Sequence, residues 1–130
     1  MEWQSNARNR IGLGALKMAG TCFETSLKKW LELFYKGGKD IKIAHGLVTG
    51  QTGYVKDKKY GHAWVEINDQ VCLDTETNIT FPKEEYYEIG KINPEDVYLY
   101  DKKEIGHWVT TNGTYGPWEL EETEFEKEMG

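Results

Sequence analysis

Three residues of this chain have the types that thiol catalysis requires: Cys22, His62 and Asp74. A cysteine thiolate is a nucleophile, an imidazole can accept the thiol proton and return it, and a carboxylate can hold the imidazole in place. Cys22 falls at the start of an expected helix, whereas His62 and Asp74 fall on consecutive expected strands. We therefore expect the three to form a Cys-His-Asp catalytic triad.

The element that must position Cys22 is a helix over 23–35. Its apolar residues recur at spacings of three, four and seven, which predicts one buried face: Phe23, Leu27, Trp30, Leu31, Phe34 and Tyr35. Thr21 and Glu24 have the spacing of a capping box, so the helix should begin at Thr21. Cys22 would then lie in the first turn, where free N–H groups and the helix dipole favour a thiolate. A weaker pattern predicts a short helix over 7–19.

Three strands are expected next, over 41–48, 60–67 and 70–75. Alternation divides the second strand into two faces: Ala63, Val65 and Ile67 on the core face, and His62, Trp64 and Glu66 on the other. In the third strand Val71 and Leu73 would face the core, which leaves Cys72 and Asp74 on the face of His62.

The connection between the second and third strands decides whether this geometry is possible. A two-residue turn at Asn68 and Asp69 would pair Ala63 with Asp74 and turn the carboxylate to the wrong face. A three-residue loop over 68–70 would instead place Trp64 opposite Asp74, with His62 diagonal to it. We predict the three-residue loop. We expect Glu66 and Glu76 to be solvated.

The rest of the chain predicts smaller elements. A short helix is expected over 83–89 and a strand over 97–100. The aromatic residues Trp108, Tyr115 and Trp118 predict an anchored loop, and the acidic segment 119–130 is expected to be a frayed tail. One dominant helix followed by consecutive strands predicts an α+β fold, in which residues 1–130 form a single domain with the helix packed on an antiparallel sheet.

Bulk properties exclude several classes of protein. An apolar fraction of 38% is too high for a disordered chain, and a formal net charge of -6 disfavours binding to phosphate backbones, so we expect no nucleic-acid partner. The polar N-terminus and the lack of a long apolar run predict a cytoplasmic protein that does not bind membranes. In that compartment the two cysteines are expected to be free thiols.

The same residue types allow other interpretations. Cys22, Cys72, His45 and His62 are of the types that bind zinc, although their spacing is not that of a zinc finger, and we expect neither metal nor cofactor. Cys22 and Cys72 could also form a disulfide. The main alternative is a catalytically inactive protein that binds a small ligand or a host protein in an aromatic pocket lined by residues among Tyr60, Trp64, Trp108, Tyr115 and Trp118.

A family resemblance adds to this interpretation. Cys at a helix start, then His-Ala-Trp-Val-Glu over 62–66, a turn, and an apolar strand ending in Asp74 resemble the transglutaminase-like branch of the papain-type cysteine hydrolase superfamily. The segments His45-Gly46-x-x-Thr49-Gly50-Gln51, Tyr60-Gly61-His62-Ala63-Trp64-Val65-Glu66 and Tyr115-Gly116-Pro117-Trp118 are similar to small uncharacterised phage and bacterial proteins, a resemblance that covers about residues 20 to 118. For a phage protein the compartment would be the host cytoplasm.

The resemblance implies acyl transfer through a thioester, as in a protease, amidase, deamidase or transglutaminase, on a protein, peptide or small amide substrate. Cys22 would be the nucleophile, His62 the general base and then acid, and Asp74 the orienting group. The chain departs from the pattern because position 16, where a papain-like enzyme might have an oxyanion-hole Gln, is Leu16. The Cys22 N–H with the side chain of Gln51 or Asn78 is the expected substitute. His45 and Trp64 are further candidates for substrate binding.

Overall fold

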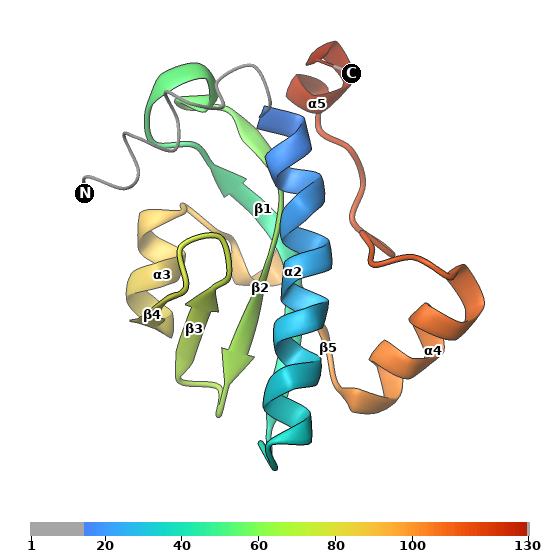
Figure 1. Ribbon diagram of the computed structural model, residues 1–130. Helices are drawn as coiled ribbons and strands as arrows, with labels where there is room; N and C mark the ends of the chain where they lie inside the picture. The colour runs from blue at the N-terminus through green and yellow to red at the C-terminus, as the bar shows by residue number, and fades with distance from the viewer. Residues whose placement is uncertain (1–14, 130) are drawn as a thin grey trace.

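A long helix crosses one face of a five-stranded antiparallel sheet in the computed structural model, which describes residues 15–129 (Figure 1). The strand order is β4-β3-β2-β1-β5. The strands are β1 (Ile41–Thr49), β2 (Lys59–Ile67), β3 (Val71–Asp74), β4 (Ile79–Pro82) and β5 (Tyr98–Tyr100). The helices are α2 (Ala15–Tyr35), α3 (Lys83–Ile89), α4 (Lys102–Asn112) and α5 (Glu124–Met129), with short 3-10 turns at Gly53–Val55 and Pro94–Asp96. The predicted α+β class and antiparallel sheet are confirmed.

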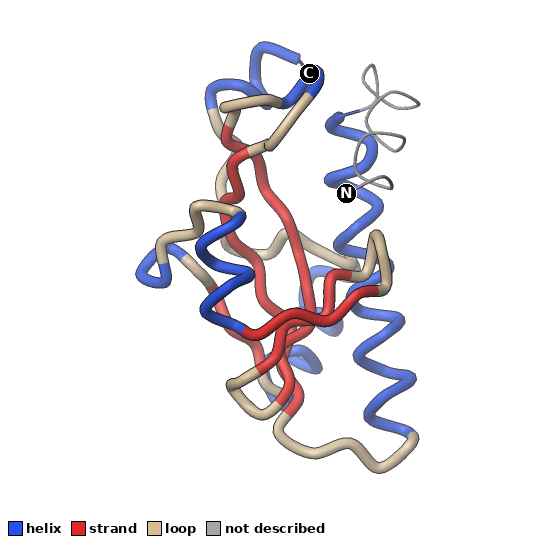
Figure 2. The backbone as a smooth tube through the Cα atoms, turned by 90° about the vertical axis from the view of Figure 1, so that its left-hand side faces the viewer, coloured by secondary structure: helices blue, strands red, loops and turns tan. Residues whose placement is uncertain are grey.

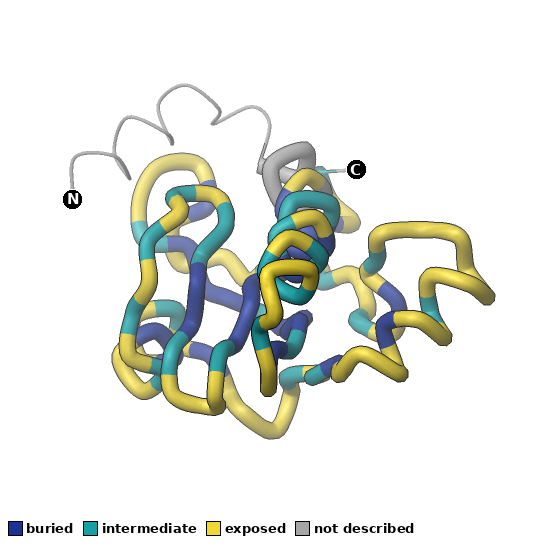
Figure 3. Tube along the Cα trace, turned by 60° about the horizontal axis from the view of Figure 1, so that its bottom comes forward, coloured by how far each residue is buried: buried dark blue, intermediate teal, exposed yellow. Residues whose placement is uncertain are grey.

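The sheet lies between α2 on one face and α3 on the other (Figure 2). On the α2 face, Val65 and Leu73 pack with Trp30 of the helix. On the α3 face, Trp64 and Cys72 pack with the aromatic rings of the short helix. This is the division of side chains that the alternation in the sequence predicts, and buried residues accordingly run along the central strands (Figure 3).

The start of the long helix differs from the prediction. Helix α2 begins at Ala15, so Cys22 is its eighth residue and lies about two turns inside it. The residues before Thr21 include strong helix formers, and their propensity outweighs the local capping signal of Thr21 and Glu24. The short helix expected over 7–19 lies outside the described residues up to position 14, and from Ala15 onward it is part of α2.

The loop between β2 and β3 has the predicted length. Val65 pairs with Leu73 and Ile67 with Val71, which leaves three residues between the strands. Asn68 and Asp69 have φ values of 56° and 57°, a left-handed conformation that Asn and Asp tolerate better than most residues. Continued by one position, the same register sets Trp64 opposite Asp74, as expected.

The chain after β3 is more ordered than the sequence analysis expects. Strand β4 and helix α4 were not predicted, although Asp101 and Glu104 form a capping box at the start of α4. The acidic segment is not frayed along its length, because α5 occupies Glu124–Met129 and Glu126 is buried. Within residues 15–129, none of the helices is both long enough and apolar enough to cross a bilayer.

A buried carboxylate, that of Glu66, links helix α3 to the sheet. Glu66, expected to be solvated, is only 2% exposed. Its Oε2 accepts hydrogen bonds from the Trp64 indole N–H at 2.9 Å and from the Tyr87 hydroxyl, and its Oε1 lies 3.1 Å from Lys83 Nζ. The Cys72 thiol also donates to Oε2, at 3.8 Å. A carboxylate can be buried here because several donors replace its hydration.

We predict that Glu66→Ala lowers the free energy of unfolding by about 3 kcal/mol, because it leaves the buried Trp64 and Tyr87 donors without their acceptor and removes one of the two carboxylates that Lys83 binds. Urea denaturation followed by tryptophan fluorescence measures the change. The control is Glu88→Ala on the exposed side of α3, expected to change stability by less than about 0.5 kcal/mol. Equal effects of the two variants would contradict the role assigned to Glu66.

Candidate active site

The three predicted residues meet at an edge of β2. Strand β3 ends at Asp74, so from Ala63 toward the start of β2 this side of the strand has no β3 partner. Cys22 approaches from α2, and its Sγ accepts a hydrogen bond from the Ala63 N–H at 3.3 Å. His62 belongs to the same short stretch of β2. The gap left by the early end of β3 is therefore where the sulfur and the imidazole meet.

The distances at this edge are those of an interacting group. A ring nitrogen of His62, the Cys22 sulfur and a carboxylate oxygen of Glu76 all lie within 4.8 Å of one another. Asp74 Oδ1 lies 3.8 Å from His62 Nε2, and Glu76 Oε1 lies 3.6 Å from His62 Nδ1. These are ion-pair distances and are longer than a good hydrogen bond, a common state of catalytic groups without a substrate.

The surroundings of His62 favour a protonated ring. Burial alone would lower its pKa, but the interactions of the ring with Cys22 and with the carboxylates of Glu76 and Asp74 outweigh burial and raise the pKa from 6.5 to about 10. A protonated imidazole beside a thiol favours the thiolate form. The predicted contribution of the helix dipole is absent, because Cys22 lies too far from the helix start for the dipole to act on it.

Asp74 is itself held in place. Its Oδ2 accepts a hydrogen bond from the Tyr86 hydroxyl of α3 at 3.3 Å, and its Oδ1 accepts from the Glu76 N–H at 3.0 Å. Burial, followed by the charge of Asp74, raises the pKa of Tyr86 well above its ordinary value, so the hydroxyl remains a donor. Glu76 is exposed, as expected, but sequence analysis missed its position beside His62, and it also missed Tyr86. The available signal for this position was the pair of carboxylates, Asp74 and Glu76, separated by one residue of the chain.

Hydroxyl groups join the hairpin after β3 to the helix that carries the thiol. The Thr75 hydroxyl lies 3.1 Å from the hydroxyls of Thr25 and of Ser26, and Ser26 is fully buried. Ser26 follows Cys22 by one helical turn, and Thr75 separates the two carboxylate residues. These bonds hold Asp74 and Glu76 at a fixed distance from the sulfur.

The chain matches no family model, no curated protein and no solved structure with which it was compared. The resemblance to transglutaminase-like enzymes therefore stays a prediction. The interpretation of the site rests on its geometry alone.

The oxyanion donors expected from the sequence are not brought to the thiol. The Cys22 N–H lies inside α2, where it is used by the helix, and the Gln51 amide donates to the carbonyls of Thr49 at 3.1 Å and Ile89 at 2.7 Å. Asn78 is exposed, with a φ of 61°, and serves the turn between β3 and β4. Ala63 supplies the N–H that lies at the sulfur instead.

Trp64 is a core residue rather than the wall of a substrate site. It is fully buried, and its ring lies 6.0 Å from that of His62 and 5.4 Å from that of Tyr86. Its indole N–H is bound to Glu66. Trp64 therefore supports the imidazole from the α3 face of the sheet.

His45 lies on the other face, in an aromatic cluster. Its ring centroid is 4.7 Å from Phe23, 4.9 Å from Tyr100 and 5.0 Å from Trp118. A methyl group at Gly116 would come within 2.7 Å of the ring, so the absence of a side chain there lets the backbone lie against it. Both ring nitrogens are buried without a hydrogen-bond partner, and burial lowers the pKa of His45 to about 3. The ring is a neutral packing element.

Fewer side chains of metal-binding types lie together than the sequence suggests. The two cysteines are free, which confirms the expectation of free thiols. Cys72 donates to Glu66 and His45 lies in the aromatic cluster, so neither joins Cys22 and His62. In residues 15–129 the one close group of metal-binding types is Cys22, His62 and Glu76. A protonated His62 cannot coordinate a metal, which disfavours this use of the group.

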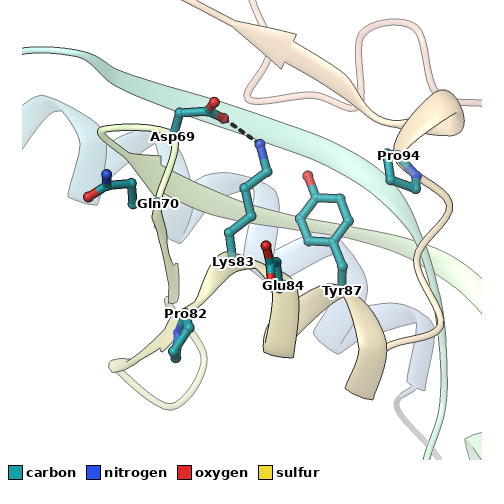
Figure 4. A pocket seen from close by; sticks show the side chains of 7 residues that line it. All are labelled: Asp69, Gln70, Pro82, Lys83, Glu84, Tyr87 and Pro94. Atoms are coloured by element: carbon teal, nitrogen blue, oxygen red, sulfur yellow. Dashed lines mark hydrogen bonds and ion pairs between the residues drawn. The ribbon is translucent and has the colours of Figure 1, made fainter.

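A pocket of about 480 Å³ lies elsewhere, by the loop between β2 and β3 (Figure 4). Lys83 extends across it toward Asp69, with the Tyr87 ring beside it and Pro82 and Pro94 at its margins. None of its lining residues belongs to the group around Cys22.

The buried His45 predicts how the stability of the protein depends on pH. The folded pKa of His45 lies below its unfolded value of about 6.5, so the unfolded state takes up a proton that the folded state excludes, and stability falls as pH drops from 6.5 toward 3. His45→Phe keeps a ring but removes this titration. Between pH 6.5 and 5 the wild type should lose about 2 kcal/mol more stability than the variant. Urea titrations at both pH values measure this difference, and parallel losses in the two proteins would refute a buried neutral His45.

Proposed function

We propose that the chain is a cysteine-dependent acyl-transfer enzyme with Cys22 as nucleophile, His62 as general base and acid, and Asp74 as the orienting group. The observation that carries the proposal is that the Cys22 sulfur lies within 4.8 Å of a His62 ring nitrogen, while the carboxylates of Asp74 and Glu76 lie within ion-pair range of the same ring. A histidine held protonated beside a thiol by carboxylates at an edge of a sheet has a chemical use, whereas packing alone would not require it.

In the first step the Cys22 thiolate attacks the carbonyl carbon of an amide and a carbon–sulfur bond forms. The Ala63 N–H, which lies at the sulfur, is the backbone donor placed to stabilise the negative oxygen of the tetrahedral intermediate. His62 then gives its proton to the amide nitrogen, the carbon–nitrogen bond breaks and the amine leaves. The acyl group remains on Cys22 as a thioester.

In the second step water or another nucleophile attacks the thioester. His62, now neutral, takes the proton of the attacking group, and the carbon–sulfur bond breaks to restore the thiolate and the imidazolium. Asp74 stabilises the charged ring and fixes its orientation, because Tyr86 and the Glu76 N–H hold its own carboxylate. Glu76 adds a second negative charge beside the ring.

A second candidate is binding without catalysis, favoured by the pocket beside Lys83 and Tyr87, which is separate from the thiol. The two functions differ in the chemistry of Cys22. An acyl-transfer enzyme should form a covalent acyl group on this residue, and a binding protein should not.

We predict that p-nitrophenyl acetate transfers its acetyl group to Cys22 with release of p-nitrophenolate, because the ester is an activated acyl donor. Intact-mass measurement should show one acetyl group and peptide mapping should place it on Cys22. Cys22→Ala should remove it while the circular dichroism spectrum is retained. Acetylation that persists in Cys22→Ala would contradict the assignment of the nucleophile.

Alkylation by iodoacetamide tests the thiolate–imidazolium pair directly. The proposed function requires a Cys22 thiolate paired with the His62 imidazolium, whose pKa is raised to about 10, so the alkylation rate at Cys22 should change little between pH 6 and pH 8. In His62→Ala the alkylation rate should follow the titration of an ordinary thiol with a pKa of about 8.5. The rate should then fall about tenfold for each pH unit below that value. If the pH profiles of the two proteins coincide, the pair does not exist.

The carboxylates should have graded effects. Asp74→Asn retains the shape of the side chain and removes its charge, so we expect acetylation to slow by about tenfold to a hundredfold, less than in His62→Ala. Tyr86→Phe removes only the hydrogen bond to Asp74 and should slow it by less than about tenfold. Rates are measured by stopped-flow detection of p-nitrophenolate. The matched control is Tyr98→Phe, at an exposed position of β5. A Tyr86→Phe defect larger than that of Asp74→Asn would exclude an indirect role for Tyr86.

A further inference from the structure

We propose that residues 119–129, here called the strap, occupy the acyl-donor site along the edge of β2 at Lys59 and Gly61, and that the donor is an extended acidic peptide with an aliphatic side chain that replaces the strap. This inference rests on the proposed function. Its starting observation is that the Cys22 sulfur belongs to a residue with 0% exposure, so that no substrate can reach the nucleophile unless something moves.

Leu120 joins the strap to the residues around the thiol. It packs on the small cluster of Cys22, Phe23 and Ala63. A side chain at Gly61 would come within 3.0 Å of the Leu120 methyl group, so the glycine leaves room for Leu120 to lie against β2. An aliphatic side chain is therefore accommodated on the cluster that contains Cys22, and we place the side chain of a bound peptide there.

The strap is also attached to the backbone of β2, the strand that carries His62. The Glu126 carboxylate accepts from the Gly61 N–H at 3.0 Å, and the Thr123 hydroxyl donates to the Lys59 carbonyl at 2.6 Å. The strap makes both contacts through side chains, one of them from helix α5, whereas an extended peptide would bond the same edge with its main chain. A peptide in place of the strap would find the same donor and acceptor.

The charges of the strap and of the loop next to it indicate that the ligand is acidic. The strap carries six glutamates among its eleven residues: Glu119, Glu121, Glu122, Glu124, Glu126 and Glu128. It runs beside the loop before β2, to which it is joined by the Thr123 bond and by the Tyr54 hydroxyl, which donates to Met129 Sδ at 3.3 Å. That loop exposes Lys56, Lys58 and Lys59. Exposed lysines in this loop would attract an acidic peptide.

The access of iodoacetamide to Cys22 tests the strap in the full chain. Leu120→Ser and Glu126→Ala should each raise the alkylation rate of Cys22 at least about tenfold, because local opening governs the reaction of buried groups. Glu121→Ala, an exposed position of the strap, is the matched control and should leave the rate unchanged. Rates are read from the alkylated peptides by mass spectrometry.

Cys72 provides an internal control in the same experiment. It is fully buried on the α3 face, and burial together with the Glu66 charge raises its pKa, so it should react only when the protein unfolds. Faster alkylation of Cys22 with an unchanged rate at Cys72 supports the strap. Rates that rise together, or a Cys22 rate that does not rise, overturn it.

A peptide with the sequence of residues 118–127 tests the ligand. Added to Leu120→Ser, the peptide should slow alkylation of Cys22 at least about threefold, because it takes the place of the strap. A peptide of the same composition in scrambled order should not slow it. Equal effects of the two peptides overturn the proposed ligand class. Repeating the series in His62→Ala separates the two proposals: strap opening still raises access there, whereas the proposed function fails if His62→Ala leaves the pH profile of Cys22 unchanged.

Discussion

The early end of β3 is the constraint on which the site depends. If the strand continued beyond Asp74, its backbone would take up the Ala63 N–H and its side chains would fill the space that the Cys22 sulfur occupies. The chain instead turns at 75–78, and the turn brings Glu76 back to the imidazole and Thr75 to the hydroxyls of α2. One interruption in the sheet thus creates the gap, supplies a carboxylate and fixes the distance to the helix.

The two histidines of the central strands show that burial does not by itself determine protonation. His45 pairs with Ala63, and Gly46, its neighbour in β1, pairs with His62, so the two rings stand on adjacent strands and opposite faces. Among aromatic rings, burial lowers the pKa of His45 to about 3. His62 is as deeply buried, yet charged neighbours raise its pKa to about 10. Charged partners, rather than burial or residue type, distinguish the catalytic candidate from the packing residue.

The parts of the site that follow from periodicity could be predicted from the sequence. Alternation in β2 and β3 gave the faces, and the requirement that Asp74 share the face of His62 gave the three-residue loop. The start of α2 could not be read from Thr21 and Glu24, because a capping signal is local and the preceding helix formers override it. Glu66 was misjudged for a different reason: the Lys83 and Tyr87 donors that permit its burial come from a helix whose docking the local pattern does not encode.

Access to the thiol and its activation are separate in this structure. The groups that charge and orient the pair come from β2 and from the hairpin after β3: the Ala63 N–H, Asp74 and Glu76. The strap contributes an aliphatic contact through Leu120, and the Glu126 carboxylate is directed to the Gly61 N–H. Under the two proposals, moving the strap would uncover the sulfur without removing any group that stabilises the imidazolium. The proposed nucleophile is then preorganised before substrate arrives, and its exposure depends on whether the strap or a peptide lies beside β2.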